Sequence, residues 1–102
     1  MASREPHENE LVGQRLRRLR EAQGYDSQGA FAALLGVSAP RWNQVENGMP
    51  MSRDIAFRLV KAVPGLTLDW LYFGKPDGLP LELARRLGEL SSQPGKRTSA
   101  PR

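Results

Sequence analysis

Q-G-A-F-A-A-L-L-G-V-S-A-P-R-W-N-Q-V, residues 28–45, is the stretch that decides the fold of this chain. Its main apolar positions are Phe31, Leu35, Val37, Trp42 and Val45. The first two of these are four residues apart and the last two are three apart, so each pair lies on one face of a helix. Gly36 supplies the positive backbone φ that ends a helix sharply, and the small Ala32 suits the crossing point of two helices. The stretch predicts two short helices that pack at a steep angle.

Boundary signals extend this helical pattern along the chain. Gly24 closes a first helix and Ser27 suits the N-cap of a second. Ser38 or Ala39 caps a third, in which Pro40 is tolerated only within the first turn. The expected helices are residues 8–23, 27–36, 39–46, 52–62, 67–72 and 80–90. No strand is expected, so the predicted fold class is all-α.

The later helices carry apolar residues at helical spacing. The inward residues of the helix 52–62 are expected to be Ile55, Leu59 and Val60 or Ala62. The last helix has a narrow seam formed by Leu79, Leu83, Leu87 and Leu90. This seam either folds back on the body of the protein or pairs with a second subunit, and the pattern does not distinguish the two.

Four aromatic residues complete the expected packing. Trp42 and Trp70 occupy apolar helical positions, which predicts that both belong to the core. Tyr72 and Phe73 can form a partner surface, but packing against the helix 52–62 is the favoured interpretation. Aromatic residues thus contribute to the core at two points of the chain.

The composition indicates one small domain. The 102 residues are 39% hydrophobic, enough to close a single core, and they include no cysteine and one histidine. A thiolate metal site is excluded, and a reducing cytoplasm is the expected compartment. The sequence has no apolar run long enough for a membrane span, and its N-terminus lacks a signal-peptide core. We therefore expect neither membrane association nor a bound cofactor.

The net charge of +4 lies mostly in the tail. Residues 1–90 carry twelve Lys/Arg against eleven Asp/Glu, and Lys96, Arg97 and Arg102 supply the rest. A nucleic-acid partner must therefore be argued from a motif and not from charge. The expected organisation is a disordered leader at 1–7, a main domain at 8–74, a C-terminal helical extension at 75–90 and a disordered tail at 91–102.

Residues 12–74 resemble the Cro/repressor-type (XRE) helix-turn-helix DNA-binding family. The matching pieces are V-G-Q-R-L-R-R-L-R, S-Q-G-A-F-A-A-L-L-G-V-S, V-E-N-G and L-D-W-L-Y-F-G, in the family's order and spacing. The resemblance implies a compact five-helix repressor-like bundle, here followed by an additional helix, with double-stranded DNA as the partner. In this family the third helix lies in the DNA major groove.

The resemblance also implies a set of DNA-binding residues. This set is Gln28, Ser38, Ala39, Pro40, Arg41, Asn43, Gln44 and Asn47. Arg41 is the strongest candidate for base reading, because a guanidinium can bind guanine O6 and N7 together. Ala39 and Pro40 stand where family members carry polar groups; neither can hydrogen-bond a base edge, although Ala39 can contact a thymine methyl. Gln28 is expected to touch a phosphate, with a helix-capping role as the alternative.

The basic residues of the first helix have two possible roles. Arg15, Arg17 and Arg18 lie off its apolar stripe and form either a solvated face or a track of phosphate contacts. The resemblance further places Arg20 beside Glu46, which predicts a buried ion pair between the first and third helices.

No catalytic constellation is present in the sequence, because the single histidine lies in the leader and no base is available to pair with a serine. We therefore do not expect an enzyme, nor a small-molecule ligand. The expected function is a cytoplasmic, sequence-specific DNA-binding regulator, a repressor that acts as a homodimer. The alternative is a protein-interaction module that keeps the fold without DNA readout, which the Ala39-Pro40 pair leaves open.

Overall fold

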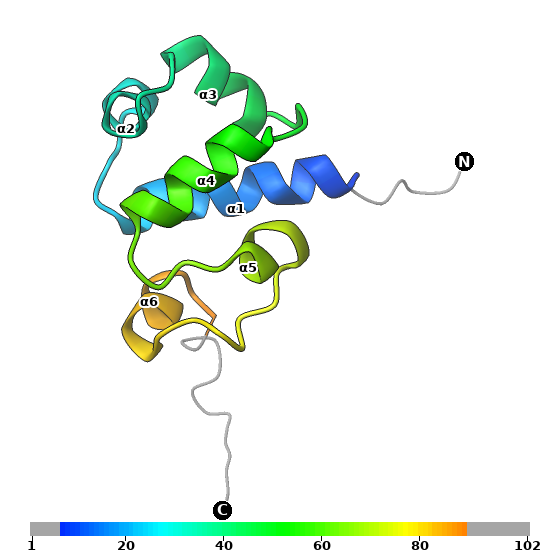
Figure 1. Ribbon diagram of the computed structural model, residues 1–102, viewed down its shortest axis with the longest axis vertical. Helices are drawn as coiled ribbons and strands as arrows, with labels where there is room; N and C mark the ends of the chain where they lie inside the picture. The colour runs from blue at the N-terminus through cyan, green and yellow to red at the C-terminus, as the bar shows by residue number, and fades with distance from the viewer. Residues whose placement is uncertain (1–6, 90–102) are drawn as a thin grey trace, which may run out of the picture.

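The computed structural model describes residues 7–89, which form six helices and no strand (Figure 1). The helices are α1 (Glu8–Ala22), α2 (Gln28–Leu35), α3 (Ala39–Glu46), α4 (Arg53–Ala62), α5 (Leu68–Phe73) and α6 (Leu81–Arg86). The all-α prediction is confirmed, and within the described part no helix is long and apolar enough to cross a bilayer. The predicted disordered segments lie outside the described residues, with the exception of His7.

Hydroxyl side chains begin the helices α2 to α5. The N-caps Ser27, Ser38, Ser52 and Thr67 each accept a hydrogen bond from the backbone N–H three residues on, at 3.1 to 3.2 Å. These bonds satisfy N–H groups that have no partner inside the helix. Of the two residues proposed to cap the third helix, Ser38 does so, and Ala39 and Pro40 follow in the first turn.

A capping box begins α1, and the sequence pattern missed it. The Nδ1 atom of His7 accepts from the backbone N–H of Asn9, and the carboxylate of Glu10 accepts from the backbone N–H of His7, both at 3.1 Å. The assignment of His7 to a disordered leader was therefore wrong. Histidine is not among the preferred N-cap residues, so the usual sequence signal for a helix start was missing.

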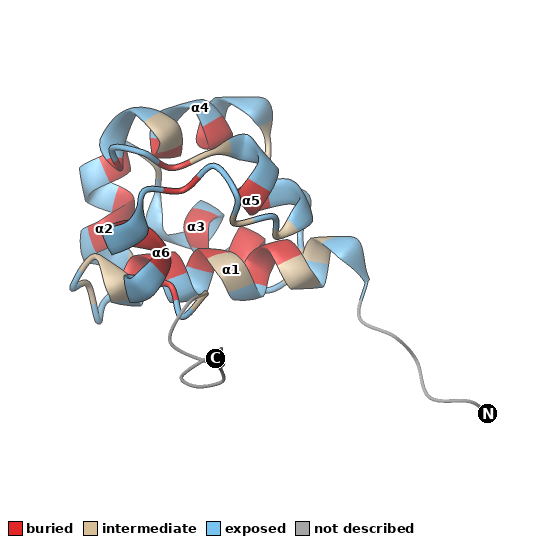
Figure 2. Ribbon diagram, turned by 90° about the horizontal axis from the view of Figure 1, so that it is seen from below, coloured by how far each residue is buried: buried red, intermediate tan, exposed pale blue. Residues whose placement is uncertain are grey.

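The core lies between all six helices, whose buried residues are coloured red in Figure 2, and it includes two tryptophans. Trp42 and Trp70 are fully buried, as predicted, and the ring of Phe31 meets that of Trp42 edge-on with centroids 5.2 Å apart. Burial of Ile55 and Leu59 in α4 is also confirmed, and of the two alternatives for the third position Val60 packs against the core whereas Ala62 is exposed. The helix ends at Ala62, and the side chain of the next residue, Val63, is buried in the core as well.

The exposure of Tyr72 and Phe73 corrects a second expectation. Trp70 and Leu71 take the buried positions of α5, while Tyr72 and Phe73 remain exposed and do not pack into the core against α4. In a helix of six residues, only one face turns toward the core, and Trp70 and Leu71 occupy it. The rings of Tyr72 and Phe73 therefore point away from the core. Their centroids lie 6.4 Å apart on the surface.

The leucine seam folds back on the body of the protein. Leu79, Leu83 and Leu87 are all buried within the same chain, so the seam does not present a free dimer surface. The helix α6 is shorter than predicted, because Gly88 follows with a φ of +83° and ends it. Leu90 lies outside the described residues.

Polar contacts from α1 and α5 hold this C-terminal part. The indole Nε1 of Trp70 donates to the carboxylate of Glu89 at 2.7 Å. Arg18 donates to the backbone carbonyl of Leu87 at 3.0 Å and lies over the Trp70 ring, while Arg15 donates to the carbonyl of Leu71 at 2.8 Å. Two of the three arginines outside the apolar stripe of α1 therefore have a structural role.

Two helices approach each other closely at Gly13, where α1 meets the end of α3. A Cβ atom built on Gly13 would lie 2.5 Å from the carbonyl oxygen of Glu46 and 2.8 Å from that of Val45. Real Cβ atoms do not approach backbone this closely, so only glycine allows the two helices to pack at this distance. Ala32, which the sequence placed at a helix crossing, is fully buried as well.

We predict that Gly13→Ala destabilises the fold by about 1 to 3 kcal/mol, because the added methyl group forces α1 away from α3. The matched control is Gly29→Ala, since a Cβ there meets no atom closer than 3.7 Å and the backbone φ is not positive. That control should leave stability unchanged or raise it by up to about 1 kcal/mol. Chemical denaturation of both variants is the measurement. Equal stability of the two variants would contradict the close approach at Gly13.

Candidate nucleic-acid interface

The helix α3 presents a continuous exposed surface at the end of the molecule away from α6 (Figure 1). Its exposed residues, with the C-cap, are Ala39, Pro40, Arg41, Asn43, Gln44 and Asn47. The buried residues of the same helix, Trp42, Val45 and Glu46, all face the core side. Six of the eight sequence-predicted DNA-binding residues therefore share the exposed surface of one short helix and its end.

The two ends of α3 differ in chemistry. At its start, the Ser38 hydroxyl accepts from the backbone N–H of Arg41, and the apolar Ala39 and Pro40 are exposed beside it. At its end, the Nδ2 group of Asn47 donates to the carbonyl oxygen of Asn43 at 2.8 Å and to its side-chain oxygen at 3.1 Å. The amide groups are thus ordered at the C-terminal half of the helix.

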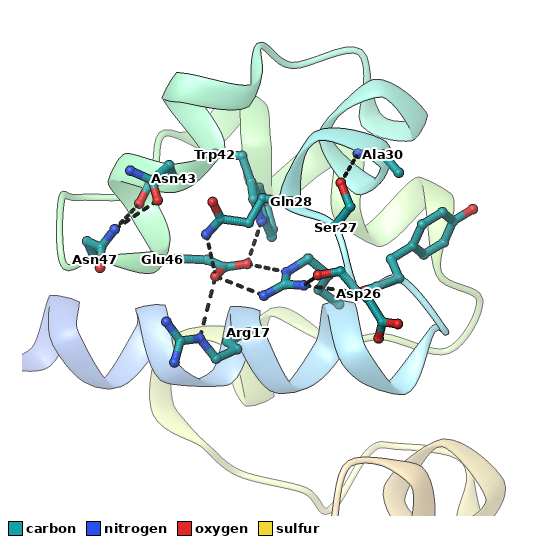
Figure 3. A network of polar contacts seen from close by, with 11 residues as sticks. Arg17, Asp26, Ser27, Gln28, Ala30, Trp42, Asn43, Glu46 and Asn47 are labelled. Atoms are coloured by element: carbon teal, nitrogen blue, oxygen red, sulfur yellow. Dashed lines mark hydrogen bonds and ion pairs between the residues drawn. The ribbon is translucent and has the colours of Figure 1, made fainter.

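A fully buried carboxylate, that of Glu46, joins α3 to α1 and α2 (Figure 3). Its Oε2 atom accepts from Nε of Arg20 at 2.7 Å and from the indole Nε1 of Trp42 at 2.6 Å. Its Oε1 atom accepts from the side-chain amide of Gln28 at 2.9 Å, and Nε of Arg17 lies 3.7 Å from the same oxygen. The predicted ion pair between Arg20 and Glu46 is confirmed.

The guanidinium of Arg20 also fixes the loop between α1 and α2. Its Nη1 group donates to the backbone carbonyls of Tyr25 and Asp26, at 2.9 and 2.6 Å. The ring of Tyr25 in turn lies 5.2 Å from that of Phe31. One buried arginine therefore holds the end of α3 and the loop between α1 and α2 together.

Gln28, predicted to bind a phosphate or to cap its helix, does not act as the cap. Ser27 fills that position, and Gln28 is the first helical residue of α2. Its side-chain amide points to Glu46 instead, beside Arg17 (Figure 3). Sequence reasoning missed this contact and the one from Trp42. The four-residue spacing of Trp42 and Glu46 would have indicated the second, because it places both on one helix face.

The surrounding donors stabilise the charged form of Glu46. Burial by itself raises the pKa of this carboxyl, but hydrogen bonds from Arg20, Gln28 and Trp42 outweigh burial, so the pKa of Glu46 lies below its ordinary value. The pKa of Arg20 is raised, chiefly by its hydrogen bond to Glu46. Both partners therefore stay charged in the folded protein at neutral pH.

We predict that Glu46→Ala lowers the stability by about 3 kcal/mol, because it leaves the guanidinium of Arg20 buried without its partner. The control is Asp54→Ala, which removes an exposed carboxylate 3.0 Å from Arg58 on one helix. Exposed pairs contribute at most about 1 kcal/mol. Thermal or chemical unfolding of the two variants is compared at pH 7. A melting temperature for Glu46→Ala equal to that of wild type would refute the importance of the buried pair.

The same carboxylate predicts an acid-sensitive stability. Since the pKa of Glu46 is lower in the folded than in the unfolded chain, its contribution is fully present above the ordinary value of about 4.3. That contribution is lost as the pH falls through the lowered pKa. The stability difference between wild type and Glu46→Gln should therefore be largest near neutral pH and shrink below about pH 4.3. A difference independent of pH would show that Glu46 does not titrate in this way.

The part of the chain that the structure describes contains no group of three His, Cys, Asp or Glu residues able to hold a metal ion. All buried side-chain nitrogen and oxygen atoms of this part have a hydrogen-bond partner.

A comparison with known protein families identifies the domain. A family model described as a helix-turn-helix domain matches residues 11–63, just over half of the chain, from the first turn of α1 to the end of α4. Searches of curated proteins and of solved structures gave no match. The matched range contains α3, the buried Glu46, its three hydrogen-bond donors and Arg17. The chain therefore belongs to the helix-turn-helix domain family, consistent with its XRE-type resemblance.

Proposed function

We propose that this protein is a sequence-specific DNA-binding regulator of transcription, a cytoplasmic repressor that acts as a homodimer. The observation that carries the proposal is the exposed face of α3, held rigidly against α1 and α2 by the buried Glu46. A helix of this kind fits the width of the DNA major groove, where base edges carry a distinct pattern of donors and acceptors. Neither a cofactor nor a small-molecule ligand is part of the proposal.

Each exposed residue of α3 has a proposed contact. Arg41 binds the O6 and N7 acceptors of a guanine, and the amides of Asn43 and Gln44 pair with an adenine or a phosphate. Ala39 contacts a thymine methyl group, beside Pro40. At the two ends of the helix, Ser38 and Asn47 position the DNA backbone, and Gln28 binds a phosphate from the start of α2.

The proposed dimer uses the aromatic pair on α5. Tyr72 and Phe73 are exposed, and Phe73 has 69% of its surface accessible, whereas the leucine seam is already buried. Two copies double the number of base contacts, which a module of this size needs for tight specific binding.

The second candidate function is a protein-interaction module that retains the fold. The exposed Ala39 and Pro40 favour it, because an apolar start to α3 suits a protein partner better than polar base edges. A binding selection with random duplex DNA distinguishes the two functions. Enrichment of one roughly palindromic site supports the regulator, and the absence of any enriched sequence supports the interaction module.

We predict that Arg41→Ala costs about 1 to 3 kcal/mol of binding free energy and relaxes the preference at one base pair. The control is Arg86→Ala, which removes an exposed arginine from α6 at the far end of the molecule. Competition binding against a panel of single-base changes, at one fixed salt concentration, measures both variants. If Arg41→Ala weakens binding to every sequence equally, Arg41 contacts a phosphate. Base recognition then depends on Gln44, Asn43 or DNA shape.

We also predict that Phe73→Ala weakens self-association, because it removes most of the exposed aromatic surface of α5. Phe57→Ala is the matched control, since Phe57 on α4 is exposed to a similar degree, at 68%. Sedimentation velocity with and without an operator of two half-sites about 10 base pairs apart is the measurement. A wild-type protein that stays monomeric both free and on DNA would rule out the dimer.

A further inference from the structure

A groove at the C-terminal ends of α2 and α4 contains none of the proposed DNA contacts. It is a hollow of about 260 Å³, lined by Leu34, Leu35, Arg58, Lys61 and Ala62. Leu34 has 52% of its surface accessible, and Ala62 is exposed as well. The hollow is smaller than the roughly 300 to 1,000 Å³ of typical small-molecule sites, so it suits one or two side chains of another protein.

The outer face of α4 continues this surface. Asp54, Phe57, Arg58 and Lys61 are all exposed and follow one another at steps of three, one and three residues, so they share one face of the helix. A second hollow, of about 290 Å³, is lined by Arg53, Asp54 and Phe57 in the first half of the same helix. Figure 2 shows α4 at the edge of the molecule, with much of its outer side exposed. Two hollows along one helix match apolar side chains on successive turns of a second helix.

The charges around the groove are mainly positive. The helix α2 contains no charged residue, whereas α4 exposes three cations and one carboxylate. Arg58 already has partners, because its Nη1 donates to the carbonyl of Leu35 and its Nε donates to the carboxylate of Asp54, both at 3.0 Å. Lys61 forms no ion pair with any residue of 7–89. The groove therefore combines an apolar wall with a cation that is available to a partner's carboxylate.

We propose that the groove between α2 and α4 is a docking site for an acidic amphipathic helix of a partner protein. An apolar side chain of that helix enters the hollow against Leu34 and Ala62, and a carboxylate about one turn away pairs with Lys61. Burial of the apolar side chain supplies affinity, and the charge pair sets the orientation of the helix. The proposal goes beyond the DNA-binding function and does not depend on it, because the two surfaces share no residue.

An acidic helix fits this groove better than nucleic acid or a second copy of the chain. A DNA backbone can pair with Lys61, but it offers hydrated phosphates and no apolar group to the wall at Leu34. Within the described residues, Leu81 with Glu82 on α6 is a comparable exposed pair. Two arginines of α6 lie beside that carboxylate, however, and their charge would oppose the cations of the groove.

A synthetic acidic helix tests the site on the full chain. The probe is an acetylated peptide of about 20 residues, long enough to form a helix, with leucine at every third or fourth position and glutamate beside it. In a nuclear magnetic resonance titration, the backbone amides of Leu34, Lys61 and Ala62 should shift and saturate. A matched peptide with glutamine in place of glutamate should bind about threefold more weakly or less, and added salt should reduce the difference.

Four exposed positions supply the variants and their controls. Lys61→Glu should weaken binding of the acidic peptide about fivefold, since an exposed ion pair contributes up to about 1 kcal/mol. Lys75→Glu is its control, because Lys75 is also exposed but lies after α5. Leu34→Ala should weaken binding about three- to tenfold. Its control is Leu81→Ala, which removes a leucine with 66% of its surface accessible from α6. Both controls should bind the peptide as wild type does.

Several results would overturn the docking site. It is wrong if the groove amides show no saturable shift at about 1 mM peptide, a concentration that detects weak association. It is also wrong if Lys61→Glu and Leu34→Ala bind as wild type does, or if the glutamine peptide binds as tightly as the acidic one. A short DNA duplex that shifts the groove amides more than the peptide does would assign the groove to nucleic acid. Self-association of wild type that is lost in Leu34→Ala would assign it to a second copy of the chain.

Discussion

The position of α3 depends on one buried carboxylate. Glu46 is fully buried at the end of that helix, and its oxygens bind donors from α1, α2 and α3 itself. An unpaired carboxylate in this place would cost several kcal/mol, so the donors must be present together for the three helices to meet. The requirement is geometric as well as energetic, because hydrogen bonds tolerate little variation in distance. The carboxylate thereby fixes the angle at which the exposed face of α3 is presented.

The buried polar network is coupled to the apolar core through Trp42. Its ring packs against Phe31 of α2, while its indole N–H donates to Glu46. The ring of Tyr25 packs against the same Phe31 ring, and the backbone carbonyl of Tyr25 accepts from Arg20. A change in core packing would therefore move the hydrogen-bonding groups as well. The large aromatic side chain of Trp42 thus satisfies both sets of contacts.

The sequence predicted the helices well because their ends carry local signals. Ser27, Ser38 and Gly36 act at positions where the backbone needs a cap or a positive φ, and such needs are met within a few residues. The periodicity also predicted which apolar residues share a helix face, but not which other part of the chain packs against that face. It did not decide whether the leucine seam folds back or forms a dimer, and the expected packing of Tyr72 and Phe73 against α4 was wrong. Both outcomes depend on contacts between segments that are distant in the sequence. The role of Gly13 could not be predicted from the local sequence either, because it depends on the backbone of α3 that packs against this residue.

The candidate site was predicted less completely than the fold. The family resemblance placed the exposed residues of α3 and the pair of Arg20 with Glu46, but not the division of donors between the two carboxylate oxygens. That division follows from the packing of α1 against α3 at Gly13, which brings Arg17 within reach of Glu46. Close packing at this glycine therefore also sets the polar contacts of Glu46. It brings the guanidinium of Arg17 to the carboxylate oxygen that accepts from the side-chain amide of Gln28, so that α1 and α2 meet at one buried group.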